Sequence, residues 1–337
     1  MTLREAIAVV AGGRSLTELE MADVVSALIA GDASAAQIGG LLMALRMKGE
    51  SVAELCGAAR ALRRHATPVK IPPGVVVDTC GTGGDGQRTF NVSTAAALIA
   101  AGAGVRVAKH GNRAMSGTVG AADVLEELGV RLDAPVATLE RQLAHAGIAF
   151  LFAPRLHPAM ARVAPMRREL GVRTIFNLAG PLANPAGVRH QVVGVWDRRW
   201  LRPMADALAR LGSERALVVH GRDGLDEITL SDATDTAEVR DGSVTEGSVD
   251  PEDLGLPRCD SAALRVIGVA AAAAAIRAVL AGEPGPRRDV ALANAAAALY
   301  VTGRCDTLRA GVALAAEAVD DGRARRVLAD LVRASAA

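Results

Sequence analysis

Hydrophobic and polar residues follow a helical period through the first 67 residues. Apolar side chains such as Val24, Leu28 and Leu41 recur three or four positions apart, and short polar turns interrupt them. This spacing gathers apolar side chains on one face of each segment, so we expect four short helices. The expected starts are Thr2, the capping box Ser15-Leu16-Thr17-Glu18, Ser34 and Ser51, and the last three helices are expected to end near Gly31, Lys48 and His65.

Beyond the prolines at 68, 72 and 73, short Val- and Ile-rich runs alternate with helical segments. This alternation is typical of an α/β fold with a mostly parallel central sheet flanked by helices. The expected strands are Val75–Asp78, Val105–Lys109, Ile148–Phe152, Gln191–Val195 and Ala216–His220. The expected helices are Asn91–Ala103, Val119–Leu128, Pro135–Gly147, one that ends at Leu211, and the segments 261–282, 287–302 and 306–335, whereas 229–250 has the pattern of a polar meander.

Composition narrows the class of protein. A chain of 337 residues is long enough for one large domain and a smaller one, as in many enzymes. The formal net charge of +1 argues against nucleic acid as the main partner, because such proteins carry a clear basic excess. The four cysteines are widely spaced, which favours reduced thiols and a cytoplasmic location. The apolar run Val266–Leu280 is too short and too alanine-rich for a membrane span.

The first strand leads into a glycine cluster, at positions 81, 83, 84 and 86, that precedes a helix opened by Ser93 and Thr94. Glycines let the backbone approach an anion closely, and the free N–H groups of a helix start attract negative charge. The next strand delivers Lys109, one of only three lysines in the chain, to the same edge of the sheet. A compact point charge suits a pyrophosphate, although a lysine that merely reaches solvent from a strand end is an equally good reading.

Two acidic features raise the question of a metal. Asp226 and Glu227 follow a strand within a glycine-bearing loop, as Mg²⁺ ligands that share the ion with substrate phosphates commonly do. The alternative is an exposed acidic turn. Asp85 lies among the expected phosphate donors, where it would repel an anion unless it caps a turn or helps to hold a cation.

The glycine cluster also fits the GxGxxG pattern of nicotinamide- and flavin-dependent enzymes. In that fold the helix starts within the glycines and the second strand ends in an acid. Here a loop intervenes and the second strand ends in Lys109, so both observations count against a dinucleotide site.

Eight motifs in this order resemble those of the anthranilate phosphoribosyltransferases of tryptophan biosynthesis. The motifs are GTGGD (81–85), FNVST (90–94), KHGNR (109–113), ADVLEELG (122–129), HPAM (157–160), RRELGVRTIFN (167–177), GPLANP (180–185) and GLDE (224–227). The resemblance implies the fold shared with pyrimidine nucleoside phosphorylases. It implies a small helical domain, from residues 1–70 and a returning segment at about 160–184, and a large α/β domain, from 74–159 and 185–337.

The same resemblance implies a reaction and a set of site residues. The phosphoribosyl group of phosphoribosyl pyrophosphate would pass to the amine of anthranilate, in a homodimer formed through the helical domain, with two Mg²⁺ per subunit and no acid–base catalyst. The residues implied for phosphoribosyl pyrophosphate are Gly81, Gly84, Asp85, Thr89, Asn91, Ser93, Thr94 and Lys109. Those implied for anthranilate are Gly81, His110, Asn112, His157, Arg167 and Gly180, and those for the metal are Ser93, Asp226 and Glu227.

Two alternatives and one departure accompany this resemblance. A nucleoside phosphorylase of the same fold would use free phosphate, and some relatives are associated with nucleic acid. The KHGNR and HPAM motifs with the distant Arg167 favour an aromatic carboxylate acceptor, and the net charge disfavours nucleic acid. The segment Ala114–Val119 carries fewer hydroxyls than the serine-rich loop common in the family, which leaves fewer donors for the pyrophosphate.

Overall fold

The computed structural model describes residues 1–114 and 119–336. The departure noted at Ala114–Val119 therefore lies largely outside the described residues. Four helices open the chain: α1 (Leu3–Ala11), α2 (Glu18–Ala30), α3 (Ala35–Lys48) and α4 (Val52–Arg64). Each begins with a capping box, in which a Ser or Thr hydroxyl and the side chain three residues later bond to each other's backbone N–H groups.

The capping box expected at Ser15 is wrong by two residues. The box of α2 is formed by Thr17 and Glu20. Leu16 is fully buried, and its backbone N–H donates to the carboxylate of Glu54 at 3.0 Å, so the chain is not yet helical there. Glu54 also caps α4 and pairs with Lys48 at 2.8 Å, and it thereby joins the starts of α2 and α4.

Seven strands form one sheet in the order β3-β2-β1-β4-β5-β6-β7. Strands β1 to β5 are parallel, and β6 and β7 are antiparallel additions, so the expectation of a mostly parallel sheet is confirmed. Their bounds are β1 (Val76–Asp78), β2 (Arg106–Gly111), β3 (Ile148–Phe152), β4 (His190–Gly194), β5 (Arg215–Gly221), β6 (Thr234–Arg240) and β7 (Ser243–Val249).

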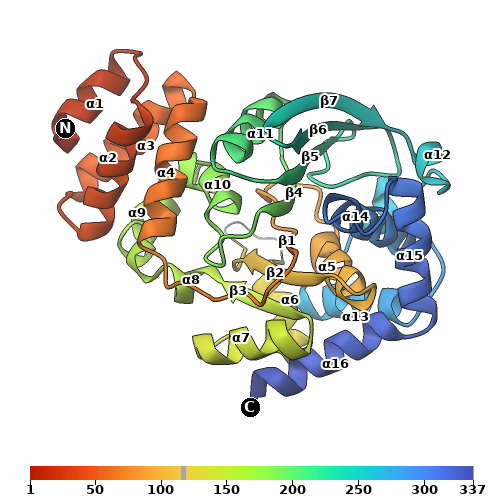
Figure 1. Cartoon of the computed structure of the whole chain (residues 1–337). Coiled ribbons are helices and arrows are strands. Elements are labelled where there is room, and N and C mark those ends of the chain that lie inside the picture. Colours follow the sequence, from red (N-terminus) through yellow and green to blue (C-terminus); the bar gives the residue numbers. More distant parts are fainter. Residues whose placement is uncertain (115–118, 337) are drawn as a thin grey trace.

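Helices cover both faces of this sheet (Figure 1). One face packs on α5 (Val92–Gly102) and α14 (Pro286–Val301), outside which lie α13 (Val269–Leu280), α15 (Leu308–Asp320) and α16 (Arg323–Ala336). The other face packs on α7 (Val136–His145) and α11 (Leu201–Arg210). The shorter elements of this part are α6 (Ala121–Glu127), η3 (Arg198–Trp200), α12 (Pro251–Leu254) and η4 (Ser261–Leu264).

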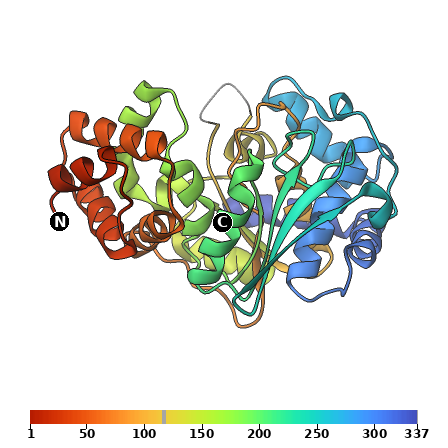
Figure 2. The ribbon, with the colours of Figure 1, turned by 90° about the horizontal axis from the view of Figure 1, so that it is seen from above.

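A run of short helices crosses between the helical part and the sheet. Figure 2 shows the helical bundle at one end of the molecule with this yellow-green segment beside it. Residues of the segment, such as Val163, Ile175 and Phe176, share one apolar cluster with α2–α4 and α11. The elements are α8 (Ala153–Leu156), η1 (Pro158–Arg162), α9 (Ala164–Leu170), α10 (Ile175–Ala179) and η2 (Pro181–Ala183).

The meander expected at residues 229–250 contains the antiparallel β6–β7 hairpin, whose two-residue turn, Asp241-Gly242, has positive φ at both positions and so matches the twist of the strands. Two other expectations for the C-terminal half are wrong. The segment 306–335 is two helices, because the chain turns at Asp321-Gly322, where Gly322 has φ +74°. The helix expected at 261–282 starts only at Val269. Among the described residues, no helix is both long enough and apolar enough to cross a bilayer.

The strand order identifies the part of the sheet where a ligand is expected to bind. It runs from β1 to β3 in one direction and from β4 to β5 in the other, so β1 and β4 flank the point where the order reverses. The loops that leave the carboxyl ends of two such strands diverge to opposite sides, and the crevice between them is where open α/β sheets bind ligands.

Close packing of α2 on α4 depends on Gly57, and this generates a stability prediction. A Cβ at Gly57 would overlap the carbonyl oxygen of Glu18 and lie 2.8 Å from Cβ of Met21. We expect Gly57→Ala to lower the free energy of unfolding by about 1–3 kcal/mol, as overpacked sites do. Urea denaturation measures this change.

The matched control is Gly40→Ala in α3. An added Cβ there meets no described atom within 4 Å, so we expect a gain of up to about 1 kcal/mol from helix propensity. Equal effects of the two substitutions would contradict the packing argument.

Candidate active site

The glycine loop lies against the end of β4. Gly83, Gly84 and Gly86 have φ of +64°, +81° and +78°, a region that side chains disfavour. Thr82 donates its backbone N–H to the carbonyl of Gly194 at 2.8 Å, and a Cβ at Gly81 would lie 3.1 Å from that same oxygen. The loop between β1 and α5 is therefore fixed at the point where the strand order reverses.

Helix α5 begins at Val92, after this loop, with Asn91 as its first flanking residue. Asn91 makes no side-chain cap and instead donates to the carbonyl of Val119 at 2.8 Å. Its Oδ1 and the buried Oγ1 of Thr94 have no hydrogen-bond partner among the described residues. Thr89, just upstream, pairs with Arg265 in an isolated bridge. The first turn of α5 thus presents polar atoms that a ligand could satisfy.

Lys109 reaches the same helix start from β2. It is only 3% exposed, and its Nζ lies 3.0 Å from the carbonyl of Thr79 and 3.2 Å from Oγ of Ser93. A lysine that only snorkels to solvent would not be enclosed in this way. Lys109 lies on β2 and Ser93 follows β1, and both were predicted to bind a phosphate group. The fold therefore makes these two residues neighbours.

The acidic pair follows β5 and comes to the same place. Glu227 accepts the backbone N–H of Ser93 at 3.1 Å. Burial raises the pKa of Glu227 to about 7, although Lys109 opposes this. Burial, and then the charges of Asp85 and Glu227, raise the pKa of Asp226 well above its usual value. The exposed-turn alternative is therefore wrong, because both residues are only partly exposed and Glu227 is bonded to the start of α5.

Asp85 lies beside Asp226, and its Oδ1 accepts the backbone N–H of Gln87 at 3.0 Å. It therefore caps a turn of the glycine loop while facing a second carboxylate. Three carboxylates held together in a partly buried place repel one another, when charged, unless a cation joins them. Oxygen ligands of this kind fit Mg²⁺ better than any soft metal.

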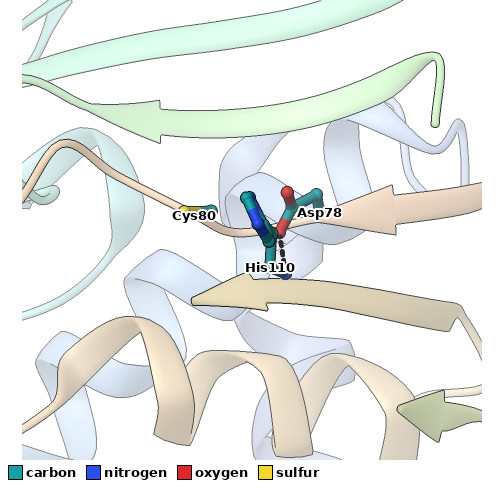
Figure 3. Close-up of side chains that lie close together, drawn as sticks. All are labelled: Asp78, Cys80 and His110. Carbon is teal, nitrogen blue, oxygen red and sulfur yellow. Dashed lines mark hydrogen bonds between the residues drawn. The ribbon is translucent and has the colours of Figure 1, made fainter. Parts of the chain in front are cut away.

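The opposite face of β1 and β2 carries a second polar group. Asp78, Cys80 and His110 have ligand atoms within 4.8 Å of one another (Figure 3). The carboxylate of Asp78 accepts the backbone N–H of His110 at 3.0 Å and the side-chain amide of Asn184 at 2.8 Å. Because both oxygens of Asp78 are already engaged, we interpret this carboxylate as a brace that joins β1, β2 and the segment before β4.

The two histidines predicted to contact an acceptor lie together. The ring centroids of His110 and His157 are 5.2 Å apart. Burial lowers the pKa of His110 to about 3, with a further contribution from His157, and burial also lowers the pKa of His157. Both rings are therefore neutral at pH 7. Three of their nitrogens have no partner among the described residues, as expected of groups that await a ligand.

The remaining predicted residues lie on the segments around this pair. Arg167, on α9, donates to Oδ1 of Asn177 at 3.4 Å and lies over the ring of Phe176, and burial lowers its pKa to about 10. No carboxylate of the described chain pairs with it. Gly180 ends α10, and Asn112 is exposed just after β2. The roles of all these residues stay predictions.

Arg173 was not among the residues that the sequence assigned to the site, although it lies in a cationic segment expected beside it. Its guanidinium donates to the carbonyl of Gly84 and lies 4.8 Å from the centre of the Trp196 ring, and its own carbonyl accepts from Arg46 at 2.7 Å. It therefore connects α3 to the glycine loop. The only sequence signal was its place in an arginine-rich segment, where a solvated helix face is equally compatible.

Two family models match the chain. The helical bundle domain of a glycosyl transferase family matches residues 4–66, and the α/β domain of that family matches residues 73–325. The fold and the matches thus define a glycosyl transferase with a helical domain followed by an α/β domain.

Individual relatives narrow this class. The anthranilate phosphoribosyltransferase of Anaeromyxobacter sp. (strain K) is 54% identical over 333 residues, which are 99% of this chain and 98% of the relative. That of Rhodopseudomonas palustris (strain TIE-1) is 52% identical over 331 residues, 98% of each chain. The chain belongs to the anthranilate phosphoribosyltransferase family.

Solved structures agree with this assignment. The crystal structure of anthranilate phosphoribosyltransferase from Thermus thermophilus superposes with a TM-score of 0.92 at 45% identity, covering 98% of this chain and 99% of that one. The enzyme from Saccharomyces cerevisiae, solved with phosphoribosyl pyrophosphate and Mg, gives a TM-score of 0.90 at 27% identity, covering 99% and 98%.

The contact between β4 and the acidic loop generates a prediction. A Cβ at Gly194 would overlap the carbonyl oxygen of Asp226, so the loop must move to admit it. We expect Gly194→Ala to lower the free energy of unfolding by about 1–3 kcal/mol and to displace the acidic pair. Denaturant unfolding and a crystal structure of the variant test both parts. An unchanged position of Asp226 would contradict the close-contact argument.

Proposed function

We propose that this protein transfers the phosphoribosyl group of phosphoribosyl pyrophosphate to the amine of anthranilate, giving N-(5-phosphoribosyl)anthranilate and pyrophosphate. This is the second step of tryptophan synthesis from chorismate. The observation that carries the proposal is the convergence of Ser93, Lys109 and Glu227 at the crevice where the strand order reverses. The similarity to an enzyme solved with phosphoribosyl pyrophosphate and Mg supports it.

The partly buried acids fit a magnesium site. Asp226 and Glu227 with the hydroxyl of Ser93 offer hard oxygen ligands, and burial raises the pKa of both carboxyl groups because it disfavours their charged form, which a cation would stabilise. Two Mg²⁺ per subunit would be held there, with Asp85 nearby. When bound, Mg²⁺ neutralises charge on the diphosphate and makes it a better leaving group.

The chain's own residues then bind the two substrates, orient them and exclude water. The glycine loop and the first turn of α5 hold the sugar diphosphate, and Lys109 supplies a fixed positive charge beside Ser93. Arg167 pairs with the acceptor carboxylate, while the neutral His110 and His157 line its ring.

In the reaction, the amine nitrogen forms a bond to the anomeric carbon as the bond from that carbon to the pyrophosphate oxygen breaks. The configuration inverts, through a state with oxocarbenium character, and the amine proton passes to the departing pyrophosphate or to solvent. Pyrophosphate is a good leaving group, so positioning and electrostatic stabilisation provide most of the rate enhancement and no residue need act as an acid or base.

The assembly and location are part of the same proposal. Residues 1–70 and 160–184 form the small domain, and 74–159 with 185–337 form the large one. A homodimer forms through the helical domain, and this is supported by two large apolar side chains that project from it, Leu19 at 78% and Met47 at 80% exposure. The enzyme works in the cytoplasm, without nucleic acid or membrane as a partner.

The decisive experiment follows anthranilate fluorescence after purified protein, phosphoribosyl pyrophosphate and Mg²⁺ are mixed. We expect a decay that stops when a chelator removes the metal. Absence of decay in a folded protein that binds phosphoribosyl pyrophosphate would refute anthranilate as the acceptor. Other amines, nucleobases with free phosphate, and a gel shift on nucleic acid would then separate the alternatives.

Arg167 provides a test of the acceptor site. Arg167→Gln removes the buried charge that would pair with the anthranilate carboxylate, and we expect KM for anthranilate to rise roughly 10- to 100-fold, as loss of a charge-assisted hydrogen bond does. KM for phosphoribosyl pyrophosphate should change less than twofold. The matched control is Arg168→Gln, one residue along α9 and exposed, which should leave both constants unchanged. Equal effects of the two variants would refute the assignment.

A further inference from the structure

Asn294 is a buried polar residue in the apolar middle of a helix. It lies in α14, is 2% exposed, and is surrounded along the chain by alanine, leucine and valine. A buried amide is costly unless its hydrogen bonds are made. Here they are made to one residue beyond the helix: Oδ1 accepts the backbone N–H of Ile228 at 2.9 Å, and Nδ2 donates to the carbonyl of Ile228 at 3.0 Å.

These two bonds engage the backbone N–H and carbonyl of Ile228, as a neighbouring strand would. Ile228 follows the end of β5 and is fully buried, yet both of its backbone groups bond to a side chain instead of a neighbouring strand. Nδ2 also donates to the carbonyl of Val290 at 2.9 Å, one turn earlier in α14, and this fixes the orientation of the amide. These bonds therefore fix the position of the Ile228 backbone relative to α14.

Ile228 directly follows the two acids of the candidate metal site. On the other side of the pair, the carbonyl of Asp226 presses on Gly194, and the carboxylate of Glu227 accepts the N–H of Ser93. These contacts limit movement of the pair toward β4 and α5. Among the described residues, the backbone of Ile228 makes its hydrogen bonds to Asn294. These bonds hold the chain directly after Glu227 to α14.

We propose that Asn294 is a positioning residue that holds Asp226 and Glu227 in the geometry that binds a divalent cation. The two bonds to Ile228 oppose movement of the loop that carries these two acids. Groups that orient metal ligands in this way commonly affect metal affinity although they do not touch the ion. The inference rests on the proposed function for the identity of the metal site.

The test uses Asn294→Ala in the full-length protein, because alanine already occupies the neighbouring positions of α14. Mn²⁺ serves as the probe, and its dissociation constant is measured by electron paramagnetic resonance in the presence of phosphoribosyl pyrophosphate. We expect the dissociation constant to rise roughly tenfold, as for other residues that orient metal ligands. At saturating Mg²⁺, KM for anthranilate should stay within twofold of the wild-type value.

The matched control is Leu299→Ala, which removes a fully buried side chain from the same helix and core without a bond to the acidic loop. It should lower the melting temperature and leave the Mn²⁺ dissociation constant within twofold. Equal shifts in both variants, or no shift in Asn294→Ala, would overturn the proposal.

A second measurement covers the case in which Asn294→Ala does not fold. Hydrogen exchange of the wild-type Ile228 amide, without metal, should be slow because Asn294 accepts its hydrogen. Exchange as fast as in an unstructured peptide would overturn the proposal. Mn²⁺ binding is scored without turnover, so a wild-type protein that binds Mn²⁺ but does not consume anthranilate would count against the proposed reaction and leave this inference standing.

Discussion

Mutual repulsion among Asp85, Asp226 and Glu227 is the constraint on which the site depends. The carboxylates lie close together and are partly buried, where charge is poorly screened, so the pKa values of Asp226 and Glu227 rise. Such an arrangement persists only if the surrounding structure supplies positive charge and a rigid frame. Lys109, the N–H of Ser93 and the start of α5 supply the charge. A divalent cation shared with a diphosphate would complete the balance, which is why the acids and the phosphate loop occupy one crevice.

The rigid frame comes from residues that have no chemistry of their own. Gly194 brings the end of β4 into contact with the main chain at Asp226, and Gly81 packs against the backbone of Gly194. The amide of Asn294 holds the next turn of chain from the other side. All three contacts involve the main chain of the acidic and glycine loops, so they do not occupy the side chains of those loops. Arg173 ties the glycine loop to the helical domain, so movement between the two parts would reach the phosphate site.

Local patterns predicted the residues that meet at the site, but not what holds them. The glycine cluster, Lys109 and the acidic pair each follow a strand, and parallel strands bring their carboxyl ends to one edge, so their convergence could be inferred. Asn294 could not be assigned a role, since its partner is 66 residues away and only the fold joins them. Its one signal was an asparagine among apolar residues in the middle of α14. The two strands within the expected meander were not located, although Asp241-Gly242 is a strong turn signal, because β7 is largely exposed and lacks the usual alternation.

Alternation along two strands explains how one edge serves two reactants. β1 and β2 pair in register, Val77 with Val107, so Thr79 lies level with Lys109 and Cys80 with His110. Successive side chains point to opposite faces, which puts Lys109 beside α5 and His110 beside His157. Under the proposed reaction, the diphosphate occupies the first face and the aromatic acceptor the second. The anomeric carbon of the sugar must then lie beyond the carboxyl ends of β1 and β2, because only there can groups from both faces of the sheet meet. A slip of one residue in β2 would exchange Lys109 and His110 and separate each from its partners, so the brace that Asp78 forms with the His110 N–H protects the order of the site as well as its stability.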